Sequence, residues 1–118
     1  MNVEELNERV RKICLSFPDV IEKVSHGAPS WFARGRMFVM FMNNHHGDGR
    51  IAIWCNAPPG AQAALVASDP KTFFVPPYVG PNGWLGIRLD RRPRWRVVTA
   101  LIEQAYSITG VKKKTSIL

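Results

Sequence analysis

The chain has 118 residues, of which 46% are hydrophobic and 21% are charged, with a formal net charge of +7 at pH 7. This balance excludes a disordered chain, and the length suits one domain that buries about two-thirds of its unfolded surface. No apolar run approaches the roughly 18 residues of a membrane span, which excludes a membrane-spanning protein.

The N-terminal segment predicts an amphipathic helix over residues 2–17, where apolar residues recur at three- and four-residue spacing. Asn2 and Glu5 are spaced as in a capping box, and Pro18 ends the helix. This acidic start differs from the basic and then apolar leader of a secreted protein. We therefore expect a cytoplasmic protein that does not enter a membrane.

The middle of the chain predicts strands joined by short turns. Residues 19–29 are ambiguous, because Gly27 and Pro29 interrupt any long element. Arg34 to Arg36 predict a tight turn around Gly35. Apolar runs and alternating patterns predict five strands, over residues 30–33, 37–42, 50–55, 72–75 and 84–89.

Two further helices are predicted, a short one over residues 61–67 and a final one over residues 93–109. Short connections between strands imply antiparallel pairing. The fold class is therefore α+β: a single antiparallel sheet of about five strands, with the N- and C-terminal helices packed on one face and a short helix in a connection. We expect one domain over residues 1–118, with 112–118 as a loose basic tail.

Several motifs occur together in one order along the chain: His26–Phe32, Gly35–Phe38, Ile53–Trp54 followed by Ala57–Pro58, Asp69–Pro70, Phe73–Gly80, Gly83–Trp84, Leu89–Asp90, Trp95 and Ala105–Tyr106. Over roughly residues 3–108 the chain resembles the MmcQ/YjbR family. The resemblance implies a compact CyaY-like, or "double wing", α+β fold. It also implies DNA binding, the activity with which the family is widely labelled. The chain departs from the family pattern at Arg36, at Cys55–Asn56 and in its basic C-terminus.

Positive charge is concentrated near the C-terminus. Residues 91–118 carry seven Lys and Arg but one acidic residue, whereas residues 1–90 carry nine against eight. Such asymmetry favours an anionic partner, although a solvated surface gives the same pattern. Our first hypothesis is a non-enzymatic DNA-binding module that contacts phosphate through seven arginines. These are Arg34, Arg36, Arg50, Arg88, Arg91, Arg92 and Arg94.

The alternative hypothesis is a small-ligand or protein-interaction domain that uses an apolar groove beside the sheet. Its candidate lining residues are Trp31, Tyr78 and Trp84. The competing interpretation is that the tryptophans lie in the core, since tryptophan is usually largely buried.

Catalytic and metal-binding patterns are weak. His45, His46 and Asp48 have ligand chemistry, but adjacent histidines on a strand point apart. Cys14 and Cys55 have no basic neighbour that would activate a thiol. We therefore expect no catalytic residues, no metal site, no cofactor and a monomeric chain.

Overall fold

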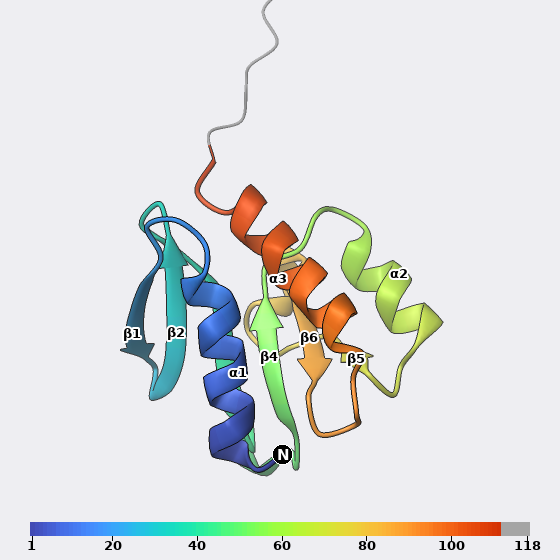
Figure 1. Ribbon diagram of the computed structural model, residues 1–118. Coiled ribbons are helices and arrows are strands. Elements are labelled where there is room, and N and C mark those ends of the chain that lie inside the picture. The colour runs from blue at the N-terminus through green and yellow to red at the C-terminus, as the bar shows by residue number, and fades with distance from the viewer. Residues whose placement is uncertain (112–118) are drawn as a thin grey trace, which may run out of the picture.

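The computed structural model describes residues 1–111 as one antiparallel sheet covered by helices (Figure 1). The helices are α1 (Val3–Leu15), α2 (Ala61–Ser68) and α3 (Trp95–Ile108). The strands are β1 (Ile21–Ser25), β2 (Ala28–Ala33), β3 (Arg36–Asn43), β4 (Ile51–Cys55), β5 (Phe73–Phe74) and β6 (Leu85–Arg88). Two short 3₁₀ turns are η1 (His45–Gly47) and η2 (Gly80–Asn82). The tail predicted at residues 112–118 lies outside the described residues.

The sheet has the order β1-β2-β3-β4-β6-β5, with every neighbouring pair antiparallel. The predicted α+β class is confirmed, with six strands where about five were expected. Within the described residues, no helix is both long enough and apolar enough to cross a membrane.

The additional strand, β1, falls in the segment that the sequence left ambiguous. It pairs with β2 through a two-residue turn in which His26 and Gly27 have φ values of 51° and 77°. Arg34 and Gly35 repeat this conformation between β2 and β3, with φ values of 53° and 78°. Paired left-handed residues suit the tight turns that match strand twist. Gly27 therefore joins two strands rather than interrupting one element.

Helices α1 and α3 lie side by side across one face of the sheet, while α2 lies at the β5 end (Figure 1). Ile53 and Cys55 of β4 point into the core beneath the two long helices. Ala52 and Trp54 point to the opposite face, where they join a smaller apolar cluster. The alternation predicted for this strand is confirmed.

A β-bulge in β3 changes which residues share a face. Trp31 of β2 pairs with Val39 and the next residue, Phe32, pairs with Met37, so Phe38 is an extra residue in β3. Phe38 and Val39 consequently both point into the helix-covered core. Met37 is turned to the other face, which it shares with Met40 and Met42.

Candidate functional site

The face of the sheet opposite α1 and α3 carries an apolar groove of about 650 Å³. Nine side chains line this groove, which we call the methionine groove: His26, Met37, Met40, Met42, His45, His46, Trp54, Tyr78 and Val79. They include all three histidines of the chain and three of its four methionines. No Lys, Arg, Asp or Glu side chain is among these lining residues.

The floor of the groove comes from β3 and β4. Met40 pairs directly with Trp54 across the two strands, and Met42 pairs with Ala52. All four residues are buried. Strand periodicity and the bulge thus gather three thioethers beside one indole ring.

The loop after β3 supplies two histidines to the wall. Asn44 has a φ of 53°, and its side-chain oxygen accepts a 2.8 Å hydrogen bond from the Gly49 backbone. The His45 and His46 rings that follow lie 4.1 Å apart between centroids. The His45 ring also meets the Trp54 ring edge-on at 4.8 Å.

The opposite wall is the segment before β6. The Gln62 side chain in α2 donates hydrogen bonds to the carbonyl oxygens of Gly80 and Trp84, and so ties this segment to α2. Tyr78 projects from it with 73% of its surface exposed. Its hydroxyl lies 3.3 Å from His46 Nε2, which brings the two walls together.

Two polar atoms at the groove are buried without a hydrogen-bond partner among the described residues. They are Nε1 of Trp54 and Nε2 of His45. Burying a polar group without a hydrogen-bond partner is unfavourable, because the group gives up its hydrogen bonds to water. Such groups call for a partner, which a bound water, ion or ligand can supply.

Three of the seven described non-glycine residues with positive φ line the same groove, and the other four are Asp19, Arg34, Asn44 and Arg92. His26, His46 and Tyr78 are non-glycine residues with φ values of 51°, 48° and 63°. Conformations of this kind cost free energy and persist where the surrounding structure enforces them, often at binding sites.

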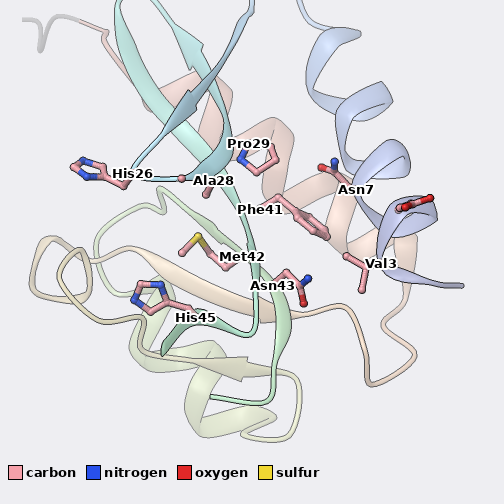
Figure 2. A pocket seen from close by; sticks show the side chains of 11 residues that line it. Val3, Asn7, His26, Ala28, Pro29, Phe41, Met42, Asn43 and His45 are labelled. Atoms are coloured by element: carbon pink, nitrogen blue, oxygen red, sulfur yellow. The ribbon is translucent and has the colours of Figure 1, made fainter. Parts of the chain in front are cut away.

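A second hollow of about 430 Å³ adjoins the groove and shares His26, Met42 and His45 with it (Figure 2). In this view the Met42 thioether projects to the side of β3 where the two histidines lie. The Phe41 ring projects the other way, toward Asn7 of α1. The hollow thus extends the groove around the end of β3.

The three residues predicted to form an apolar groove are divided between two faces. Tyr78 lines the methionine groove, and Trp84 lies on the same face beside a neighbouring hollow next to Arg36. Trp31 is fully buried on the helix-covered face. Its Nε1 donates a 3.0 Å hydrogen bond to Glu22, which also accepts a 2.8 Å bond from Arg11 of α1. Trp31 therefore anchors α1 and does not reach the groove.

Three of the seven arginines predicted to bind phosphate are engaged within the fold. Arg34 donates hydrogen bonds to the carbonyl oxygens of Tyr106 and Thr109 at the end of α3. Arg50 stacks on the Phe74 ring, 4.1 Å from its centroid. Arg88 donates two hydrogen bonds to Asp90, at 3.0 and 2.9 Å. These bonds raise the pKa of Arg88 and lower the pKa of Asp90.

The other four are exposed: Arg36, Arg91, Arg92 and Arg94. None of them forms an ion pair with another described residue. Arg91, Arg92 and Arg94 are grouped before α3, whereas Arg36 lies at the start of β3. The seven residues therefore do not form one surface.

Among residues 1–111, no three His, Cys, Asp or Glu side chains are placed to hold a metal ion. The Asp48 carboxylate instead accepts a 2.9 Å hydrogen bond from the backbone N–H of Arg50. Cys14 and Cys55 are buried, and burial raises the pKa of Cys55 to about 12. These thiols are therefore poor nucleophiles.

Sequence reasoning missed the three methionines of the groove and the part played by Trp54. The available signal was the alternation of Met40 and Met42 on one strand with Trp54 on the next. Met37 could not be added from that alternation, because the bulge reverses its face.

Comparison with known proteins supports the assignment made from the motifs. The profile of the YjbR family matches residues 15–108, from the end of α1 to the end of α3. A search of curated proteins finds no match. The matched segment contains eight of the nine described helices and strands in full. The chain belongs to the YjbR family.

Proposed function

We propose that this protein is a binding domain for a small, polarisable ligand that occupies the methionine groove. One observation carries the proposal: all three histidines and every methionine except Met1 line a single groove. The other buried hydrophobic residues on this face of the sheet are Ala28, Ala52, Trp54, Phe74 and Trp84. Core packing alone gives no reason for the histidines to gather there.

The size and chemistry of the groove suit a small ligand. Ligand pockets usually measure about 300–1,000 Å³ and combine apolar walls with a few polar groups. Methionine is flexible and polarisable, so its thioethers adapt to the shape of an apolar ligand. The free polar atoms of Trp54 and His45 would orient that ligand.

Small aromatic probes test the proposal. With methionine methyl groups labelled for NMR, benzamide or indole should shift the signals of Met37, Met40 and Met42 but leave Met1 unchanged. Trp54→Phe removes the free N–H and should weaken benzamide binding by roughly two- to tenfold, as expected for one hydrogen bond. Trp95→Phe, in α3 beneath Arg9, is the matched control and should leave binding unchanged. Probe binding that is absent, or that leaves all three groove signals unmoved, would refute the proposal.

DNA binding is a second candidate, and the exposed arginines before α3 favour it. Arg91, Arg92 and Arg94 have no ion-pair partner among the described residues and lie beside the partial positive charge of a helix N-terminus. Such a surface would contact phosphate without reading sequence. It lies outside the methionine groove, so the two functions can be tested separately.

A further inference from the structure

We infer that the methionine groove holds a soft monovalent metal ion, Cu⁺, between the thioethers of Met40 and Met42 and the imidazole of His45. The inference goes beyond the proposed function, because it adds a metal ion to a groove that is proposed above to hold a small ligand.

The three ligand groups come from one short segment of chain. Met40 and Met42 are two residues apart in β3, so their side chains lie on the same face. His45 follows at the start of η1 and lines the groove with them. Figure 2 shows the Met42 thioether projecting toward the space beside the His45 ring. The Nε2 atom of His45 is buried without a partner among the described residues, so it is free to bind an ion.

The ligand types select the ion. Thioethers are soft ligands that favour Cu⁺, and imidazole binds copper readily. Carboxylates, which calcium and magnesium require, are absent from the described lining of the groove. Zinc prefers sets of His, Cys and carboxylate ligands, and no such group of three occurs within residues 1–111. The remaining ligand groups, thioethers and imidazole, therefore fit a soft monovalent ion.

Trp54 gives the site an aromatic neighbour for a cation. Its indole pairs with Met40 across the sheet and lies 4.8 Å from the His45 ring, between centroids. A cation close to an indole face is attracted by the ring quadrupole, most strongly where water is excluded. Trp54 itself is only 2% exposed, so the site is shielded on that side.

Further ligand groups lie between solvent and the site formed by Met40, Met42 and His45. His26 and His46 are exposed residues at the edge of the groove, and Met37 continues the row of thioethers. An arriving ion would meet imidazoles first and thioethers deeper in the groove. No oxidation or reduction of the metal is part of the inference.

Silver provides a direct test, since Ag⁺ is a soft monovalent ion that does not change oxidation state under these conditions. In a chloride-free buffer, tag-free protein with labelled methionine methyl groups should bind one Ag⁺ and shift the Met40 and Met42 signals, with Met1 unmoved. Zn²⁺ should leave these methyl signals in place. Anaerobic competition with a coloured Cu⁺ chelator should give the same stoichiometry for copper.

Two sets of variants separate the groove from the thiols. Met40→Leu with Met42→Leu removes both sulfur atoms at nearly constant volume, and His45→Asn removes the imidazole. Each should weaken Ag⁺ binding by at least about tenfold, the smallest effect usually seen even for residues behind metal ligands. Cys14→Ala with Cys55→Ala is the control, because thiols also bind soft metals and both lie in the core on the other face. This variant should bind Ag⁺ normally, with its fold checked by thermal unfolding.

The inference is overturned if Ag⁺ leaves the Met40 and Met42 signals unmoved, if the leucine variant binds as tightly as the parent, or if binding disappears in a folded cysteine-free variant. Benzamide or indole binding that persists without Ag⁺ binding would leave the groove as a ligand site and remove only the metal. Failure of both experiments would remove both proposals.

Discussion

The Nε atom of Arg34 donates a 2.7 Å hydrogen bond to the carbonyl oxygen of Thr109, 75 residues further along the chain. A second guanidinium nitrogen donates to the Tyr106 carbonyl, and the guanidinium lies 4.7 Å from the centroid of the Tyr106 ring. The last carbonyls of a helix lack partners within it. A side chain at the β2–β3 turn therefore completes the end of α3.

Replacing this arginine should destabilise the fold. Arg34→Ala removes two charge-assisted hydrogen bonds, so it should lower the free energy of unfolding by about 1–3 kcal/mol. Arg36→Ala, at an exposed position two residues away, should stay within about 0.5 kcal/mol of the parent. Urea denaturation of both variants measures the difference, and equal stabilities would contradict the capping role.

Gly86 provides a second stability test. A Cβ atom at this position would lie 2.5 Å from two ring carbons of Phe74, its partner on β5. Gly86→Ala should therefore cost about 1–3 kcal/mol through overpacking. Adding Phe74→Leu should recover part of that loss, so the double mutant should be more stable than the sum of the single changes predicts. Additive effects in chemical denaturation would show that the two side chains do not compete for space.

The Arg88–Asp90 pair predicts a pH-dependent contribution to stability. Because the hydrogen bonds from Arg88 lower the pKa of Asp90, this contribution is complete above the unfolded value of about 3.9 and is lost as the pH falls through the lower folded value. Asp90→Asn should cost roughly 0.2–1 kcal/mol at pH 7. The two proteins should converge in stability at more acidic pH.

Denaturation of the parent and Asp90→Asn at several pH values measures this convergence. Glu103→Gln is a suitable control, since Glu103 is exposed and forms no ion pair with a described residue. A difference between the parent and Asp90→Asn that is constant from neutral to acidic pH would exclude the ion pair as its source.

The arginines before α3 predict the salt dependence of any DNA binding. Replacing Arg91, Arg92 and Arg94 together with Ala should reduce the slope of log affinity against log salt by up to about 0.9 per lost phosphate contact. Duplex titrations at several salt concentrations measure the slope, with Arg50→Ala as a comparison in which the arginine stacks on Phe74. No binding by the parent at low salt would end the DNA hypothesis, and an unchanged slope would assign binding to another surface.

The buried thiols should be unreactive in the folded protein. Desolvation raises the pKa of Cys14 and brings that of Cys55 to about 12, so both remain protonated at pH 8. Iodoacetamide at this pH should label neither cysteine until denaturant is added, because the thiolate is the reactive form. Rapid labelling of native protein, followed by mass spectrometry, would show that the core opens locally.

The sequence predicted the alternating strands well but could not place every side chain that depends on tertiary pairing. Ile53 and Trp54 lie on opposite faces, as the alternating pattern of residues 50–55 predicts, because strand periodicity is local. Gly27 and Pro29 predict an interruption, although His26–Gly27 has the same turn conformation as Arg34–Gly35, where a tight turn is expected. Only the pairing of β1 with β2 distinguishes a hairpin turn at these residues from the end of an element.

The candidate site was less predictable for the same reason. Trp31 and Trp84 look equivalent in sequence, yet Trp31 lies in β2 beneath α1, whereas Trp84 precedes β6 and lies on the opposite face. Arg88 was expected to meet phosphate, but Asp90 lies two residues away and binds it. Ion pairing of this kind decides which charges remain free.

The bulge at Phe38 changes the alternation of side chains along β3, so Met37 and Met40 share a face although they are three residues apart. Deleting this one residue would restore unbroken alternation to the start of β3, with Met37 still on the groove face and one large side chain fewer in the core. The inserted residue thus shifts the inward and outward alternation of side chains in β3 by one position. It lets one strand serve a rigid interior and an adaptable surface with side chains that are adjacent in sequence.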